Sequence, residues 1–222
     1  MKSSVLRRII FVLIATGLVG IAAYQMQERA LDGGVTELKS GNGAVTILKK
    51  PVTVSANNGA NAQGIGGAFS LVDQDGKAVT DEDYAGSYKL IFFGFTYCPS
   101  VCPTELQKMT LVMNQLGDKA KKIIPIFITV DPERDTPEQV KSYIAHYHPK
   151  MVGLTGTPEQ IDAVEKSFHV YAKKIKNEFM DGYMMDHSSY TYLMGPNDEL
   201  VAIYPVSDSA QDIIADIERR DF

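Results

Sequence analysis

The chain has 222 residues, of which 45% are hydrophobic and 22% charged, a composition typical of a globular protein rather than a disordered or collagen-like one. Its net charge of -5, with no basic stripe in the sequence, argues against nucleic acid as a partner. With two cysteines, it is neither a secreted scaffold with several disulfides nor a four-cysteine zinc protein.

The first predicted element is a hydrophobic segment at residues 1–24. Lys2, Arg7 and Arg8 precede an uncharged apolar run over Ile9–Ala23. The run predicts either a short transmembrane helix with snorkelling arginines or a secretory signal, and we favour an anchor that is not cleaved. Either alternative places the rest of the chain beyond the membrane, where disulfides persist.

Residues 25–66 are rich in Gly, Asn, Ala and Ser, which predicts a flexible tether. Asn42-Gly43 lies between two apolar stretches, so a small hairpin over residues 35–48 is an alternative for part of it.

A compact domain is expected over residues 67–222, with strands alternating with helices. Thr136-Pro137 and Thr157-Pro158 predict two capped helices that end near Tyr147 and Phe168. The order predicts an α/β sheet with parallel central strands and an antiparallel hairpin at one side, a thioredoxin-like fold with an added helix and strand. The other expected elements are strands at 69–72, 77–79, 90–95, 123–130, 190–193 and 200–204 and helices at 104–116 and 211–219.

Cys98 and Cys102 lie between the predicted strand at 90–95 and the helix that follows, at a strand end where ligands bind in open α/β sheets. We expect Cys98 to cap the helix, Pro103 to fall in its second turn, and the helix N-terminus to favour both thiolates. The spacing allows a redox-active disulfide or a shared metal ion. An inert disulfide or two buried core cysteines would have the same spacing.

A third metal ligand has to come from elsewhere, and His187 is the candidate among four histidines. It precedes the predicted strand at 190–193, whose entry faces the cysteine motif in a thioredoxin-like fold. Asp186 is expected to orient its ring. The alternative is a histidine hydrogen-bonded in a turn. The other three are expected at solvated helix ends or an edge: His146, His148 and His169.

Two thiolates and an imidazole suit Cu(I), and also Cu(II) when a further ligand joins, although zinc would accept the same donors. Met184 and Met185 are either additional soft donors or packing residues. The acidic segment Asp131–Asp135 follows the second buried strand, and it is either a solvated rim or a collar for a cation or a docking partner.

Four ordered segments over about residues 67–205 form a recognisable set: Phe92–Leu106, Phe127–Pro137, Gly153–Thr157, and Asp186–Ser188 with Tyr192–Met194. Together they closely resemble the SCO/SenC family. The resemblance implies a thioredoxin-like fold in a membrane-tethered soluble domain, with copper bound by Cys98, Cys102 and His187. It also implies copper delivery to, or thiol reduction at, the dinuclear copper centre of cytochrome c oxidase.

The sequence therefore predicts a copper metallochaperone whose soluble domain faces the periplasm from a bacterial inner membrane. Its expected partners are the copper-bearing subunit of cytochrome c oxidase and a copper donor protein or thiol reductant. Two alternatives use the same residues. One is a thiol–disulfide oxidoreductase in which Cys98 and Cys102 cycle without copper delivery, and the other is a copper or redox sensor.

Overall fold

The computed structural model describes residues 52–53, 64–176 and 182–221. The predicted anchor at 1–24 and the predicted hairpin at 35–48 lie outside these residues, as does most of the predicted tether. Within the described ranges, no helix combines the length and apolar character needed to cross a membrane.

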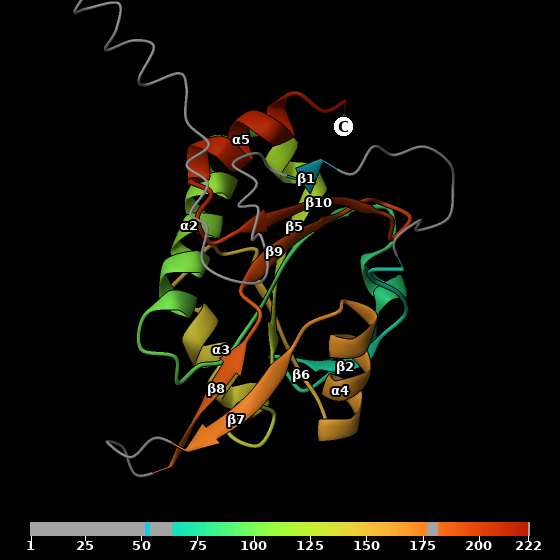
Figure 1. Cartoon of the computed structure of the whole chain (residues 1–222). Coiled ribbons are helices and arrows are strands. Elements are labelled where there is room, and N and C mark those ends of the chain that lie inside the picture. Colours follow the sequence, from blue (N-terminus) through green and yellow to red (C-terminus); the bar gives the residue numbers. More distant parts are fainter. Residues whose placement is uncertain (1–51, 54–63, 177–181, 222) are drawn as a thin grey trace, which may run out of the picture. The chain divides into compact units, whose positions relative to one another are not determined.

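Eight strands form one mixed sheet in the order β1-β10-β9-β4-β5-β6-β2-β3 (Figure 1). Its centre is parallel, as predicted, and consists of β4 (Tyr88–Gly94), β5 (Ile123–Thr129) and β6 (Val152–Thr155). Strands β6 and β1 were not predicted, and β1 falls within the predicted tether. The antiparallel strands are β1 (Val52–Thr53), β2 (Ser70–Asp73), β3 (Ala78–Thr80), β9 (Tyr190–Met194) and β10 (Leu200–Pro205).

Helices cover both faces of this sheet (Figure 1). On one face α2 packs against α5, β4 and β5, while α3 packs against β6; on the other face α4 approaches β2. The helices are α2 (Val101–Gln115), α3 (Pro137–Ile144), α4 (Pro158–Ser167) and α5 (Ala210–Glu218), with 3-10 turns η1 (Asp81–Tyr84) and η2 (Gly117–Lys122).

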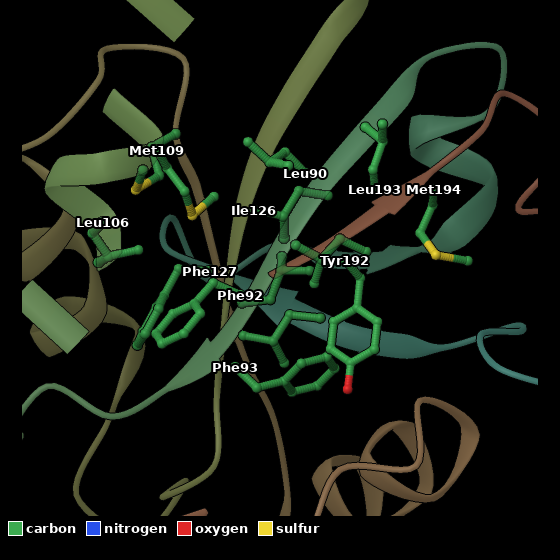
Figure 2. Close-up of a cluster of buried hydrophobic side chains, with 14 of the residues drawn as sticks. Leu90, Phe92, Phe93, Leu106, Met109, Ile126, Phe127, Tyr192, Leu193 and Met194 are labelled. Atoms are coloured by element: carbon green, nitrogen blue, oxygen red, sulfur yellow. The ribbon is translucent and has the colours of Figure 1, made fainter. Parts of the chain in front are cut away.

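Strand β4 is buried on both faces, which explains the continuous apolar run in its sequence. Phe92 and Phe127 lie in register on adjacent strands (Figure 2). Phe93 points to the opposite face, where its ring centroid lies 5.3 Å from that of Phe168 and 5.9 Å from that of Tyr192. Apolar contacts on both sides therefore fix the strand that leads to Cys98.

A separate two-stranded antiparallel sheet, not predicted from the sequence, consists of β7 (Ala172–Lys176) and β8 (Tyr183–His187). His187 is the last residue of β8 and pairs with Ala172, so it belongs to a strand rather than to the expected loop.

The two predicted Thr-Pro helix starts are confirmed. Thr136 and Thr157 each accept the backbone N–H three residues later. Gln160 completes a capping box on α4, whereas the side chain of Gln139 donates to Thr96 Oγ1 at 3.3 Å. The equivalent glutamine of α3 thus contacts the loop before Cys98.

Candidate metal centre

The two cysteines occupy the loop and the first helical turn between β4 and α2. The helix begins at Val101 with Ser100 as its N-cap, so the prediction that Cys98 caps it is wrong. Pro103 explains the later start: in the first turn its missing N–H needs no helical acceptor, whereas in the second turn its ring would clash with the preceding turn. Cys98 still contacts the helix, because its Sγ accepts the backbone N–H of Cys102 at 3.4 Å.

Cys102 is fully buried, while Cys98 is partly exposed, and both are free thiols. Gly94, the last residue of β4, makes this depth possible. A Cβ at Gly94 would lie 2.9 Å from Cys102 Sγ and 3.1 Å from the ring of Phe127, closer than atoms normally pack. A larger residue would displace the sulfur. Sequence reasoning missed this role, because a glycine after an apolar run does not show which atom approaches it.

The two thiols differ in acidity. The pKa of Cys98 falls to about 5, first because its sulfur is hydrogen-bonded by the Cys102 thiol, and also because backbone N–H groups at the start of α2 point to it. The pKa of Cys102 is raised by the same bond and by burial. At neutral pH Cys98 is therefore the thiolate and Cys102 the thiol, which corrects the prediction that both thiolates are favoured.

The structure brings His187 to the cysteines, with its Nε2 at 3.8 Å from Cys102 Sγ. Nδ1 lies 2.9 Å from the carbonyl oxygen of Ser188. Because a carbonyl only accepts, Nδ1 carries a proton, and in the neutral ring the Nε2 lone pair faces the sulfur. Asp186 is exposed. The Ser188 carbonyl orients the ring, so the prediction that Asp186 does so is wrong.

Two buried phenylalanines form a wall beside the imidazole. The ring of Phe95 meets that of His187 edge to face at 5.7 Å, and the ring of Phe92 does so at 6.5 Å. The sequence marks both as core residues, and nothing in the apolar pattern indicates this second role.

Cys98, Cys102 and His187 offer two sulfurs and a ring nitrogen, donors that suit soft and borderline metal ions. The 3.8 Å separation of Cys102 Sγ and His187 Nε2 is shorter than about 4.3 Å, the sum of typical metal–sulfur and metal–nitrogen distances, so one ion can contact both. In the part of the chain that is described, no three His, Cys, Asp or Glu side chains already have the mutual spacing of a metal site. The donor chemistry fits a thiophilic ion.

Comparison with known proteins agrees with this donor set. The family model described as SCO1/SenC matches residues 57–220. The chain belongs to the SCO1/SenC family. A relative named Protein SCO1 homolog 1, mitochondrial, from Arabidopsis thaliana is 42% identical over 159 residues, which cover 71% of this chain and 47% of that protein. The SCO2-like protein of Rickettsia felis is 39% identical over 187 residues, covering 81% of this chain and 91% of its own length. The chain thus spans about half of the mitochondrial relative and most of the bacterial one.

Solved structures show the mixed α/β, thioredoxin-like fold of Sco proteins for this domain. Arabidopsis thaliana ScoI with copper bound superposes with a TM-score of 0.66 at 40% identity, over 69% of this chain and 95% of that one. Bradyrhizobium japonicum ScoI with copper bound gives a TM-score of 0.64 at 44% identity, over 70% and 98% of the respective chains.

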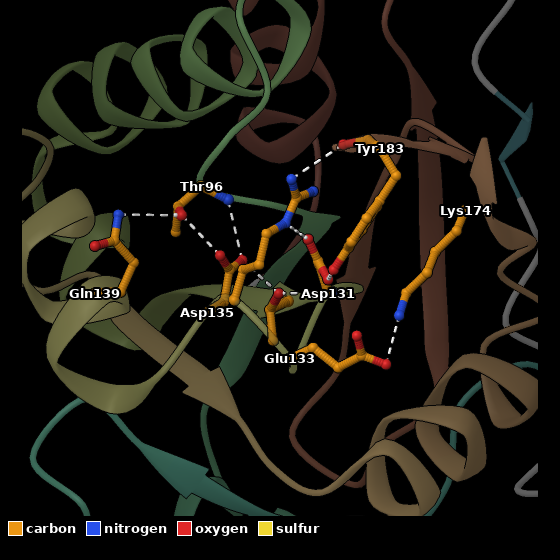
Figure 3. Close-up of polar contacts among 9 residues, drawn as sticks. Thr96, Asp131, Glu133, Asp135, Gln139, Lys174 and Tyr183 are labelled. Carbon is orange, nitrogen blue, oxygen red and sulfur yellow. Dashed lines mark hydrogen bonds and ion pairs between the residues drawn. The ribbon is translucent and has the colours of Figure 1, made fainter. Parts of the chain in front are cut away.

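In this SCO1/SenC domain, two carboxylates of the Asp131–Asp135 segment are buried. Asp131 and Asp135 have 0% exposure, so they form neither a solvated rim nor a collar open to a partner. Asp135 accepts from the N–H of Thr96 at 3.0 Å, from its hydroxyl at 2.7 Å and from the hydroxyl of Thr129 at 2.6 Å (Figure 3). Burial raises the pKa of Asp135. This carboxyl group therefore holds the residue two positions before Cys98.

The remaining candidate residues are two methionines and three histidines. Met184 and Met185 are partly buried and pack against the core, in agreement with the packing alternative. His146 is exposed after the end of α3, and Nδ1 of His148 accepts the N–H of Lys150 at 3.2 Å. His169 follows α4 with a positive φ of 54°.

Proposed function

We propose that this chain binds copper through Cys98, Cys102 and His187 and delivers it during assembly of the copper centre of cytochrome c oxidase. The observation that carries the proposal is the approach of His187 Nε2 to Cys102 Sγ, beside the low-pKa thiol of Cys98. A relative of the same family is described as a member of the Sco family of cytochrome c oxidase assembly proteins.

The surface beside the thiols supports transfer to another protein. Tyr97 and Val101, which immediately precede the two cysteines, are 52% and 42% exposed despite their large apolar side chains. Exposed apolar groups beside the partly accessible sulfur of Cys98 favour close contact with a protein partner. Copper would then pass between proteins by exchange of one thiolate for another.

Metal transfer can be measured directly. The chain is loaded with Cu(I) and mixed with the soluble copper-bearing fragment of the oxidase subunit, with its cysteines reduced. Delivery predicts that copper moves to the fragment while the thiol content of both proteins stays constant. If copper stays on the chain, delivery is refuted.

The unequal acidity of the two thiols favours a second candidate function, reduction of a target disulfide. The Cys98 thiolate would attack one target sulfur and displace the other as a thiolate. The Cys102 thiol, after losing its proton, would then attack the mixed disulfide. The target gains two electrons and becomes a dithiol, and this chain becomes the disulfide. Mixing the copper-free chain with the oxidised fragment tests this, because mass spectrometry then shows that the chain has lost the mass of two hydrogen atoms, that is, two protons and two electrons.

We also propose that residues 1–24 anchor the domain at the periplasmic face of a bacterial inner membrane. The support is the apolar run Ile9–Ala23 preceded by Arg7 and Arg8. Mass spectrometry of the membrane-extracted protein should find residues 1–24 in place. A soluble mature chain that begins near Ala23 would refute the anchor.

A further inference from the structure

The position of His187 depends on a small sheet with little support of its own. Strands β7 and β8 pair only with each other within the described chain. Because a two-stranded ribbon is marginally stable in water, contacts with the rest of the domain decide where it lies. Ser188 donates its N–H to the carbonyl of Tyr171 at 2.9 Å, and its hydroxyl accepts the N–H of Tyr171 at 3.1 Å. These bonds join the two strands to each other beyond His187, so they do not attach the ribbon to the rest of the domain, although Ala172, Met184 and Met185 pack partly buried against its core.

At the far end the ribbon meets the Asp131–Asp135 segment through Tyr183 (Figure 3). The Tyr183 hydroxyl donates to Asp131 Oδ1 at 2.7 Å, and its carbonyl accepts from Arg134 Nη1 at 3.0 Å. Arg134 Cζ lies 3.9 Å from the centroid of the Tyr183 ring. Lys174 of β7 pairs with Glu133 and lies 4.7 Å from the same centroid. The segment after β5 thus holds β8 by charge, hydrogen bonds and stacking.

Arg134 also reaches the cysteine loop. Its Cζ lies 4.8 Å from the centroid of Tyr97, the residue before Cys98. It lies 6.0 Å from the centroid of Phe95, whose ring packs against His187. One side chain therefore touches both the loop that carries Cys98 and the strand that carries His187.

The contacts of Arg134 use its planar shape as well as its charge. Nε donates to Asp131 and Nη1 to Tyr183, while Nη2 is buried with no hydrogen-bond acceptor. A buried N–H without an acceptor carries a desolvation penalty, which the electron-rich faces of Tyr97 and Tyr183 reduce. A lysine could neutralise Asp131, but it has no flat group to lie against two rings.

We propose that Arg134 is a positioning residue that sets the separation of His187 from the cysteines by joining the cysteine loop to β8. The copper affinities that test this inference rest on the proposed function, whereas the amide hydrogen exchange of β7 and β8 does not. Imidazole matters more for Cu(II) than for Cu(I), because two thiolates alone still satisfy the soft monovalent ion. Displacing β8 should therefore change the affinity for the two ions unequally.

The test compares Arg134→Gln and Arg134→Lys with Arg220→Gln in the full chain. Arg220 is a matched control: it pairs with the buried Asp216 on α5, and its side chain is 22% exposed, against 24% for Arg134. In the copper-free protein, both Arg134 variants should exchange the β7 and β8 amide hydrogens at least about tenfold faster, with β4 and β5 unchanged. Both should bind Cu(II) about 10- to 100-fold more weakly and Cu(I) within about threefold of wild type, and Arg220→Gln should change none of these.

Three results would overturn the inference. Unchanged exchange in β7 and β8 would show that Arg134 does not hold the ribbon. Full Cu(II) affinity in Arg134→Lys would reduce its role to neutralising Asp131. Equal losses for both copper ions would indicate general damage. If Arg134→Gln fails to fold, Arg134→Lys still decides, since it keeps a positive charge beside Asp131. A wild type that binds neither ion refutes the proposed function, and the exchange measurement still tests Arg134.

Discussion

Strands β4 and β8 each lead to one half of the candidate metal centre, and they are built differently. Strand β4 is buried along almost its whole length and has hydrogen-bonded neighbours on both sides. Strand β8 belongs to a two-stranded sheet whose residues are exposed or partly buried, and charged and aromatic contacts hold it to the domain. Apolar packing therefore sets the position of the cysteines, whereas that of the histidine depends on partly buried side chains together with a few polar and stacking contacts.

The largest expected effect tests this difference in stability. Phe93→Ala removes a buried ring that packs on Phe168 and Tyr192, and should lower the free energy of unfolding by about 3–5 kcal/mol. Tyr183→Phe removes one hydrogen bond from the small sheet and should cost about 1 kcal/mol. Urea denaturation of both variants measures the two losses of stability. Similar losses would show that β4 and β8 do not differ in how strongly their contacts stabilise the domain.

On the cysteine side, Cys98→Ala or Cys102→Ala should each weaken copper binding by well over about 100-fold, since even loss of a supporting group beyond the ligands costs 10- to 100-fold. One thiolate and one imidazole cannot complete a soft site. Competition titration with a Cu(I) chelator measures the affinity. A single variant that retains one tightly held copper would remove that cysteine from the site.

On the histidine side, His187→Ala removes a ligand and should weaken Cu(II) binding by more than about 100-fold and Cu(I) binding by less. The disulfide cycle should persist, because both cysteines remain. Asp186→Ala is the matched control and should leave both affinities unchanged, since the Ser188 carbonyl orients the ring. Unchanged Cu(II) affinity in His187→Ala would remove His187 from the copper site.

The smallest expected effect concerns the acidity of the Cys98 thiol in the candidate metal centre. The pKa of Cys98 is lowered to about 5, so its thiolate is present above that pH and lost below it. Alkylation of Cys98 by iodoacetamide should therefore be nearly constant from pH 8 to pH 6 and fall about tenfold by pH 4. Mass spectrometry of the peptide reports the rate. A rate that rises steeply between pH 7 and pH 9 would show an ordinary thiol.

The sequence predicts β4 well and the two-stranded sheet of β7 and β8 poorly. The run at 90–95 and the Thr136 and Thr157 caps have strong local signals, because burial on both faces and helix capping each require particular residue types. Strand β7 contains three lysines in five residues and is largely exposed, so it shows no alternating pattern. The contacts that hold the β7–β8 sheet to the domain come from Asp131 and Arg134, which lie 52 and 49 positions before Tyr183 in the chain.

Some residues of the candidate site can likewise be predicted from the sequence, and others cannot. Cys98, Cys102 and His187 are recognisable by residue type, and the fold explains why the structure brings Cys102 and His187 together. The roles of Gly94 and Arg134 depend on distances across the fold, to a sulfur and to two rings, and no spacing along the chain encodes those distances.

The hydrogen bond from His187 to Ser188 has a consequence for proton exchange. It keeps Nδ1 protonated and leaves Nε2 as the ring nitrogen that can bind an ion. Cys98 is already ionised at neutral pH, so of the two thiols only Cys102 must release a proton when a cation binds both. Metal uptake is then coupled to one proton, and affinity falls about tenfold for each unit of acidification near neutrality. A mildly acidic compartment would therefore weaken metal binding by the domain.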